Sequence, residues 1–113
     1  MLNLLRFREM ADYTNHSAIA PKQPISGRLA FDLYINHTEP FLKASGGEIL
    51  FLGDAGEFFI GPKEERWDLV MLIRQRSLAD FMSFATHEDY LKGIGHREAA
   101  IIDSRLLPIS QRS

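Results

Sequence analysis

The sequence of 113 residues contains no cysteine. Disulfide bonds, thiolate metal sites and a cysteine nucleophile are therefore excluded, and a reducing compartment is permitted. Long apolar runs are also missing, because the run from Met1 to Leu5 ends at Arg6 and is too short for a signal peptide or a membrane span. We therefore expect a cytoplasmic protein that has no membrane partner.

Basic residues are neither in excess nor clustered. Thirteen Lys and Arg residues stand against fifteen Asp and Glu residues, which gives a net charge of -2. No stretch forms the basic stripe that tracks a phosphate backbone, so nucleic acid is not an expected partner. The sequence also lacks a P-loop, a dinucleotide-binding glycine motif and a Gly-x-Ser-x-Gly elbow. We expect no cofactor.

The four histidines, His16, His37, His87 and His96, lie far apart in the sequence. No pair has the close spacing that is typical of a metal site, so we expect no metal. A single histidine suffices as an axial haem ligand, and spacing alone leaves that alternative open.

What is present is the composition of a globular protein, with 45% hydrophobic and 25% charged residues. A chain of this length accommodates one hydrophobic core, so we expect a single domain over residues 1–113. Its small size favours association with a second copy.

The hydrophobic pattern predicts the element order strand, helix, strand, strand, helix, strand. The strands are expected at residues 1–8, 48–54, 67–74 and 100–109, with a short extension at residues 57–60. The first helix begins near Ser26 and ends at Gly46. The second begins at the Ser77 capping box, breaks at Thr86 and is stopped by Gly93 and Gly95. The long polar segment at residues 9–24 is a candidate lid.

This order indicates an α+β fold of the ferredoxin-like βαββαβ type, in which two helices cover one face of a four-stranded antiparallel sheet. The strand at residues 48–54 is apolar without interruption, which suggests burial on both of its faces. The sheet face without helices therefore carries apolar residues and is expected to pack against a second copy. We expect a homodimer formed through this open sheet face.

Several short segments, taken in order, resemble the bacterial protein family known as domain of unknown function 1330. They are residues 3–7, 46–48, 67–68, 90–97 and 103–106. The resemblance implies a ferredoxin-like protomer of the dimeric α/β-barrel superfamily, and it implies no particular activity. Since relatives often carry residues before the first strand, the resemblance leaves open a start upstream of Met1.

His96 and Arg97 follow two glycines, where a backbone without side chains leaves room for a ligand. A guanidinium holds an anionic substrate while an imidazole transfers a proton near neutral pH, which makes His96 a candidate catalytic residue and Arg97 a candidate substrate-binding residue. In the alternative interpretation, Arg97 pairs with Asp103 or Glu98 and His96 caps the short helix through its C-terminal dipole, so that both residues have only a structural role.

Asp68 is the second candidate catalytic residue, because a carboxylate within an apolar strand is desolvated and its pKa rises toward that of a general base. Arg105, Asn3 and Tyr34 are further candidates for substrate binding. The alternative is again structural: Asp68 forms a buried ion pair or bonds to the backbone, and Asn3 and Tyr34 satisfy each other.

Two functions remain open at this point. The first is a cofactor-independent enzyme or binder of a small, partly apolar, anionic organic molecule, in a pocket where these six residues converge. The second is a non-enzymatic homodimeric module whose polar strand residues serve packing and register. The sequence does not decide whether the protein is an enzyme.

Overall fold

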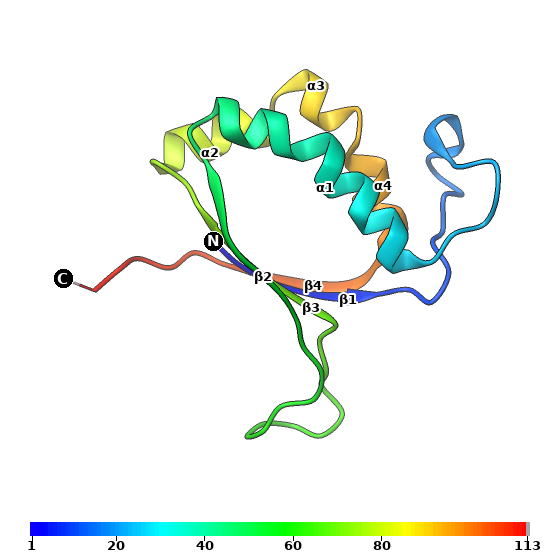
Figure 1. Ribbon diagram of the computed structural model, residues 1–113, viewed down its shortest axis with the longest axis horizontal. Coiled ribbons are helices and arrows are strands. Elements are labelled where there is room, and N and C mark those ends of the chain that lie inside the picture. The colour runs from blue at the N-terminus through cyan, green and yellow to red at the C-terminus, as the bar shows by residue number, and fades with distance from the viewer. Residues whose placement is uncertain (113) are drawn as a thin grey trace.

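The structure is a computed structural model that describes residues 1–112, and Ser113, the last residue of the expected domain, lies outside them. The chain forms four strands, four α-helices and one short 3-10 helix (Figure 1). In chain order they are β1 (Leu2–Phe7), η1 (Ser17–Ile19), α1 (Gly27–Ala44), β2 (Glu48–Asp54), β3 (Leu69–Arg74), α2 (Leu78–Ala85), α3 (Glu88–Leu91), α4 (Ile94–Ala100) and β4 (Ile101–Leu107).

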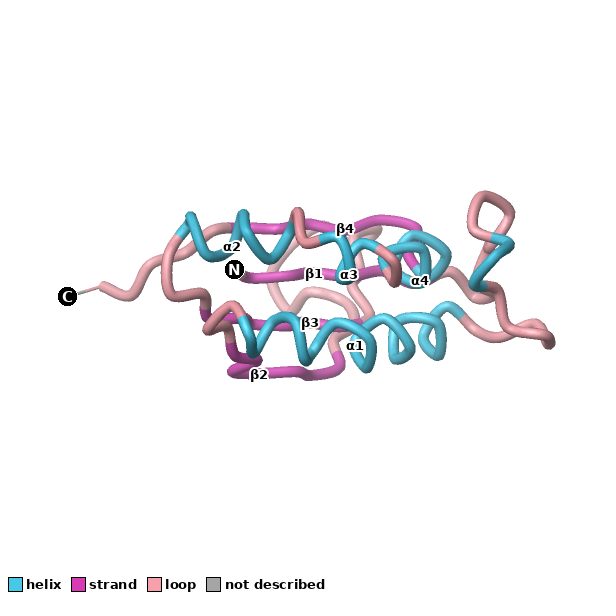
Figure 2. Tube along the Cα trace, turned by 90° about the horizontal axis from the view of Figure 1, so that it is seen from above, coloured by secondary structure: helices cyan, strands magenta, loops and turns pink. Residues whose placement is uncertain are grey.

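The strands form one sheet in the order β2-β3-β1-β4, and every neighbouring pair is antiparallel. All four α-helices cover the same face of this sheet, and the opposite face has no helix against it (Figures 1 and 2). The expected α+β class with a ferredoxin-like strand order is therefore confirmed. None of the described helices has the length and apolarity needed to cross a bilayer.

The second helical region differs from the expectation of one helix with a short restart. Ser77 caps α2 as expected, since its hydroxyl accepts a hydrogen bond from the backbone N–H of Asp80 at 3.0 Å. The expected break is also found, since Thr86 ends α2 and the short helix α3 follows, capped by His87 through its Nδ1. Gly93 and Gly95 do not stop the helix, because α4 begins at Ile94. His96 and Arg97 are therefore helical residues.

The expected bounds of β2 are confirmed, whereas those of β1, β3 and β4 were one or two residues too wide, with β3 beginning at Leu69 instead of Trp67. The expected extension at residues 57–60 is reduced to a single bridge between Glu57 and Arg66. The larger error concerns β2, which is not buried on both faces. Within one copy of the chain its central residues are half exposed, because β2 is an edge strand without a partner on its open face.

The core lies between the helices and the sheet and is centred on Leu5, Phe31 and Leu42. The segment at residues 9–24 packs at one end of this core. Its backbone bonds to the segment before α1 and to the end of α4, through Ala11 N–H to Ile25 O and Asp12 N–H to Ala99 O. The segment is therefore attached to the body of the protein along one side.

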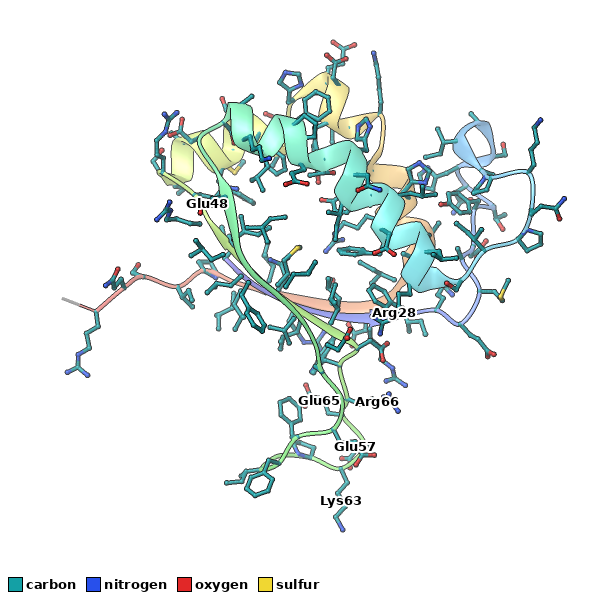
Figure 3. The ribbon with its side chains drawn as sticks, viewed as in Figure 1. Arg28, Glu48, Glu57, Lys63, Glu65 and Arg66 are labelled. Atoms are coloured by element: carbon teal, nitrogen blue, oxygen red, sulfur yellow. The ribbon has the colours of Figure 1, made fainter. Side chains whose placement is uncertain are left out.

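Residues 55–68 form a long hairpin between β2 and β3. The hairpin projects away from the helix layer (Figure 1), and Figure 3 shows Glu57, Lys63, Glu65 and Arg66 along it. The hairpin therefore extends beyond the sheet on the side that carries no helices.

Candidate functional site

A cavity of about 250 Å³ lies between the sheet and the helices. The register explains its floor, since Asn3 lies directly between Met71 of β3 and Leu106 of β4, and all three face the helices. The roof is formed by α1, α2, α3 and α4. The walls are largely apolar; their apolar members include Ile35, Leu42, Ile49, Met71, Ile73, Phe81, Phe84, Ala85, Ile94 and Leu106.

Three polar side chains enter this apolar cavity with few partners of their own. The Asn3 amide donates one long hydrogen bond, 3.4 Å, to the carbonyl of Met71. Thr38 is only 7% exposed, and its hydroxyl has no hydrogen-bond partner within residues 1–112. The side-chain oxygen of Gln75 is equally unpartnered. Because an unsatisfied buried polar group costs about 1–3 kcal/mol, these atoms mark a place where a ligand or water would be stabilised.

Tyr34 and Tyr90 form a pair at the cavity wall, with their hydroxyl oxygens 2.8 Å apart. Burial raises the pKa of the Tyr90 phenol well above its ordinary value, and the neighbouring Tyr34 adds to the effect. The positive charge of Arg97 acts in the opposite direction on the same pKa, and its effect is the smaller one. Tyr90 therefore keeps its proton at neutral pH, and the two hydroxyl groups lie at the wall of a cavity that Arg97 also lines.

Arg97 lines the cavity, and no ion pair or hydrogen bond of its guanidinium is found within residues 1–112. Both structural partners considered for it are engaged elsewhere. Glu98 binds Nε2 of His16, and Asp103 lies 2.6 Å from the Arg105 guanidinium. Hydrogen bonds from Arg105 and from the backbone N–H of Ser104 lower the pKa of Asp103, so this carboxylate already has its own partners. Arg97 is thus a half-buried cation without an anion.

His96 lies on a different side of α4 and does not line the cavity. Its Nδ1 is 2.7 Å from the hydroxyl of Tyr13, and the two rings meet edge to face. Burial, with a smaller contribution from the neighbouring His37, lowers the pKa of His96. Its position connects residues 9–24 to α4 and does not bring it into contact with Arg97's cavity.

Asp68 and Arg105 also lie outside the cavity. One Asp68 oxygen accepts a hydrogen bond from the backbone N–H of Phe7 at 2.8 Å, and the other lies 3.5 Å from the Arg66 guanidinium. The guanidinium of Arg105 stacks on the Trp67 ring at 5.1 Å. Of the six predicted residues, the structure therefore brings Asn3, Tyr34 and Arg97 together at one cavity, and places His96, Asp68 and Arg105 apart from it.

Sequence reasoning missed Thr38, Gln75 and Tyr90 as cavity residues. The sequence holds a usable signal for Thr38 and Gln75. Each is a polar residue at a position where the hydrophobic period of its segment predicts an apolar residue. Thr38 follows Tyr34 by four positions on the buried stripe of α1, and Gln75 follows Met71 and Ile73 at every second position. Within the described chain, no group of three or more His, Asp or Glu side chains is arranged to hold a metal ion.

The fold and the site together define a small α+β protein with one cavity between its helices and its sheet. No protein-family model and no curated protein matches the chain. Among solved structures, it is similar to the RPA0582 protein of unknown function from Rhodopseudomonas palustris, with 30% sequence identity and a TM-score of 0.79 over 97% of this chain and 81% of that one. The methylated RPA0582 protein is similar as well, with 30% identity and a TM-score of 0.81 over 96% of this chain and 78% of that one.

The chain belongs to the family of the RPA0582 protein. This relationship adds no activity, because the RPA0582 protein is itself described as a protein of unknown function. The resemblance to the domain of unknown function 1330 stays a prediction.

Proposed function

We propose that the protein binds a small, mostly apolar organic anion in the cavity between its sheet and its helices, with Arg97 holding the anionic group. The observation that carries this proposal is the guanidinium of Arg97, for which no ion pair is found within residues 1–112, at the wall of a mostly apolar cavity whose lining carboxylate, Glu39, lies 3.4 Å from Lys43. A half-buried cation without a counter-ion is costly, and a bound carboxylate provides the missing charge with bidentate geometry.

The cavity limits the size of this ligand. An apolar cavity of about 150 Å³ accommodates benzene, and pockets for drug-sized ligands begin at about 300 Å³. The volume here, about 250 Å³, lies between these values. A single ring or a short acyl chain that carries one carboxylate fits this range.

The polar groups are arranged to bind such a ligand at one end. Arg97 and the Tyr34–Tyr90 hydroxyl pair line the same cavity, and the unpartnered hydroxyl of Thr38 comes from the same face of α1 as Tyr34. An arginine and neutral hydroxyls recognise a carboxylate without supplying a nucleophile. The arrangement supports binding, and any reaction would need chemistry that His96 and Asp68 do not bring to this cavity.

The experiment is a titration with a panel of matched ligands, monitored by calorimetry and by thermal unfolding. Benzoate, phenylacetate and hexanoate are compared with benzamide and benzyl alcohol, which have similar shape but no charge. We expect the carboxylates to bind and to raise the melting temperature. In Arg97→Met their affinity should fall about 10- to 100-fold, because a hydrogen bond to a charged group contributes about 1.5–3 kcal/mol.

Arg105→Met is the matched control, since it removes the same charge outside the cavity. Its affinity for the carboxylates should equal that of the unmodified protein. If no carboxylate binds, or if Arg97→Met binds as tightly as Arg105→Met, the proposal is wrong.

A second proposal concerns association. We infer that two copies pack through the open sheet face. Such a dimer supports the alternative of a non-enzymatic homodimeric module, and it is compatible with ligand binding in the cavity. The register assigns to this face the apolar side chains Leu2, Leu4, Phe51, Val70, Leu72 and Leu107, together with the charged side chains Arg6, Glu48, Arg74, Asp103 and Arg105. Apolar side chains gathered in this way from all four strands are typical of an interaction surface. A cytoplasmic location stays a prediction.

A further inference from the structure

The hairpin between β2 and β3 carries an exposed apolar tip. Phe59 is fully exposed, Ile60 is 89% exposed, and Phe58 is partly exposed. A run of three large apolar residues at the end of a projecting hairpin has nothing to pack against within its own copy of the chain. Exposed apolar groups that are gathered in this way mark an interaction surface.

A groove of about 580 Å³ lies at the opposite end of the same two strands. Its lining includes Leu50 of β2, Leu72 of β3 and Phe81 of α2, together with the tail that follows β4. The hairpin leaves the end of β2 and returns at the start of β3, whereas Leu50 and Leu72 lie toward the other ends of these strands. The tip and the groove of one copy therefore cannot meet each other.

A contact between two copies is geometrically allowed. When open faces pack about a twofold axis that lies in the interface and perpendicular to the strands, the strand direction of the second copy is reversed. The β2–β3 edge then lies over the same edge of the partner, and each hairpin lies at the end of the partner's strands where the groove is found. From this geometry we propose that residues 58–60 of one copy dock in the groove of a second copy, reciprocally, so that each dimer contains two such contacts. This inference rests on the proposed open-face dimer.

The area of the sheet face alone favours this additional contact. Four strands spaced about 4.8 Å apart, each with about six residues at 3.3 Å, cover about 400 Å². A standard stable interface buries about 800 Å² on each partner. One buried aromatic side chain contributes about 150–250 Å², so Phe58, Phe59 and the groove that receives them supply the missing area.

Charge favours the same pairing. Glu57, Glu64 and Glu65 outnumber Lys63 and Arg66 on the hairpin, so this segment is acidic (Figure 3). Arg74 lines the groove and pairs with Glu48, and both side chains are more than half exposed. In the docked dimer the carboxylates of the hairpin would compete with Glu48 for Arg74, which makes a modest contribution to the orientation of the two copies.

The docked hairpin also affects the ligand cavity. Ile73, Gln75 and Phe81 line both the groove and the cavity, so the two spaces share a wall. Aromatic side chains of a partner in the groove would contact the outer side of this wall. Docking is therefore expected to change the packing of side chains that also line the ligand cavity.

The absence of cysteine permits a direct test with an engineered pair. Ile60→Cys and Ile109→Cys are combined in one chain, because Ile109 lines the groove and both residues are exposed. A disulfide needs Cα atoms about 4.4–6.8 Å apart, which only a docked partner provides. Under mild oxidation we expect most of the protein to migrate as a covalent dimer, with both thiols of each chain consumed.

Two controls accompany the pair. Ile60→Cys alone reports contact between two tips, and Ile60→Cys with Leu33→Cys places the second thiol on the exposed side of α1. Neither control should cross-link to a comparable extent. Light scattering of the unmodified protein separates the two proposals: a dimeric mass without cross-linking of the Ile60–Ile109 pair overturns the docking and leaves the dimer standing. A monomeric mass at low micromolar concentration overturns both.

Discussion

The hydroxyl of Tyr13 lies 2.7 Å from Nδ1 of His96, and this contact connects residues 9–24 to α4. Burial lowers the pKa of His96, so the neutral imidazole is favoured, and in the tautomer that carries its hydrogen on Nε2 the Nδ1 accepts a hydrogen bond from the phenol. Protonation of His96 replaces this acceptor with a donor. The contact therefore depends on pH.

The sign of this dependence is fixed by the lowered pKa. Below pH 6.5 the unfolded state binds a proton on this histidine more readily than the folded state does, so the free energy of unfolding falls as the pH falls. The loss is complete below the folded pKa. We expect urea unfolding to show a smaller decrease between pH 7.5 and 5 in His96→Gln than in the unmodified protein, and equal slopes would contradict the assignment.

NMR titration provides a second measurement at the same residue. In the unmodified protein the His96 ring should titrate below 6.5. In Tyr13→Phe the donor to the neutral ring is lost, so the His96 pKa should rise while remaining lowered by burial. An unchanged midpoint in Tyr13→Phe would mean that the hydroxyl does not stabilise the neutral form.

Thr38→Val tests the unpartnered hydroxyl in the cavity. Because this buried oxygen has no partner, its replacement by a methyl group should stabilise the ligand-free protein by about 1 kcal/mol. It should also weaken carboxylate binding. Thr86→Val is the control, since the Thr86 hydroxyl donates to the carbonyl of Met82 at 2.8 Å and its removal should not stabilise the protein. Destabilisation by Thr38→Val would indicate that the hydroxyl is satisfied by water.

The Tyr34–Tyr90 pair is suited to a double-mutant cycle. Either single change to phenylalanine leaves the other hydroxyl buried without its partner, and we expect a loss of about 1–3 kcal/mol in unfolding free energy. The double variant should lose less than the sum of the singles, with a coupling of about 0.5–3 kcal/mol. Strict additivity would show that the hydroxyls do not stabilise each other.

The open-face dimer is tested by two adjacent residues of β2 that point to opposite faces. Phe51 lies opposite Leu72 on the open face and is 56% exposed, whereas Leu52 lies opposite Met71 on the helix side and is 48% exposed. Phe51→Glu should lower the mass measured by light scattering toward that of one chain. Leu52→Glu, with the same charge and similar exposure, should not. Equal effects would place the interface elsewhere.

The element order was predictable from the sequence because each strand and helix carries its own hydrophobic period. The helix α4 was not, since Gly93 and Gly95 were interpreted as stop signals. The structure gives a different reason for both glycines: a Cβ at Gly93 would lie 2.1 Å from the His37 ring, and one at Gly95 would lie 2.8 Å from His16. These glycines permit the close approach of His37 on α1 and of His16. In the local sequence, a glycine that allows close packing cannot be told from a glycine that ends a helix.

The candidate site was only partly predictable for a related reason. Arg97 and Glu98 are neighbours in sequence, which made them a plausible ion pair, yet consecutive helical residues point in different directions. Glu98 turns toward His16, while Arg97 turns into the cavity. The burial of β2 within one copy was overestimated. An apolar run shows that both faces of a strand carry apolar side chains, but it does not show whether the second face is covered by the same chain or by another.

The two irregularities in the sheet fall in its two outermost strands. Leu50 is the extra residue of β2 opposite β3, and Ile102 is the extra residue of β4 opposite β1. A bulge twists a strand and interrupts the row of backbone donors and acceptors that a further strand would pair with. Neither side of the sheet therefore offers a template for continuous lateral growth into fibrils. A protein with apolar residues on an uncovered surface is protected in this way from open-ended polymerisation, and closed assemblies are favoured.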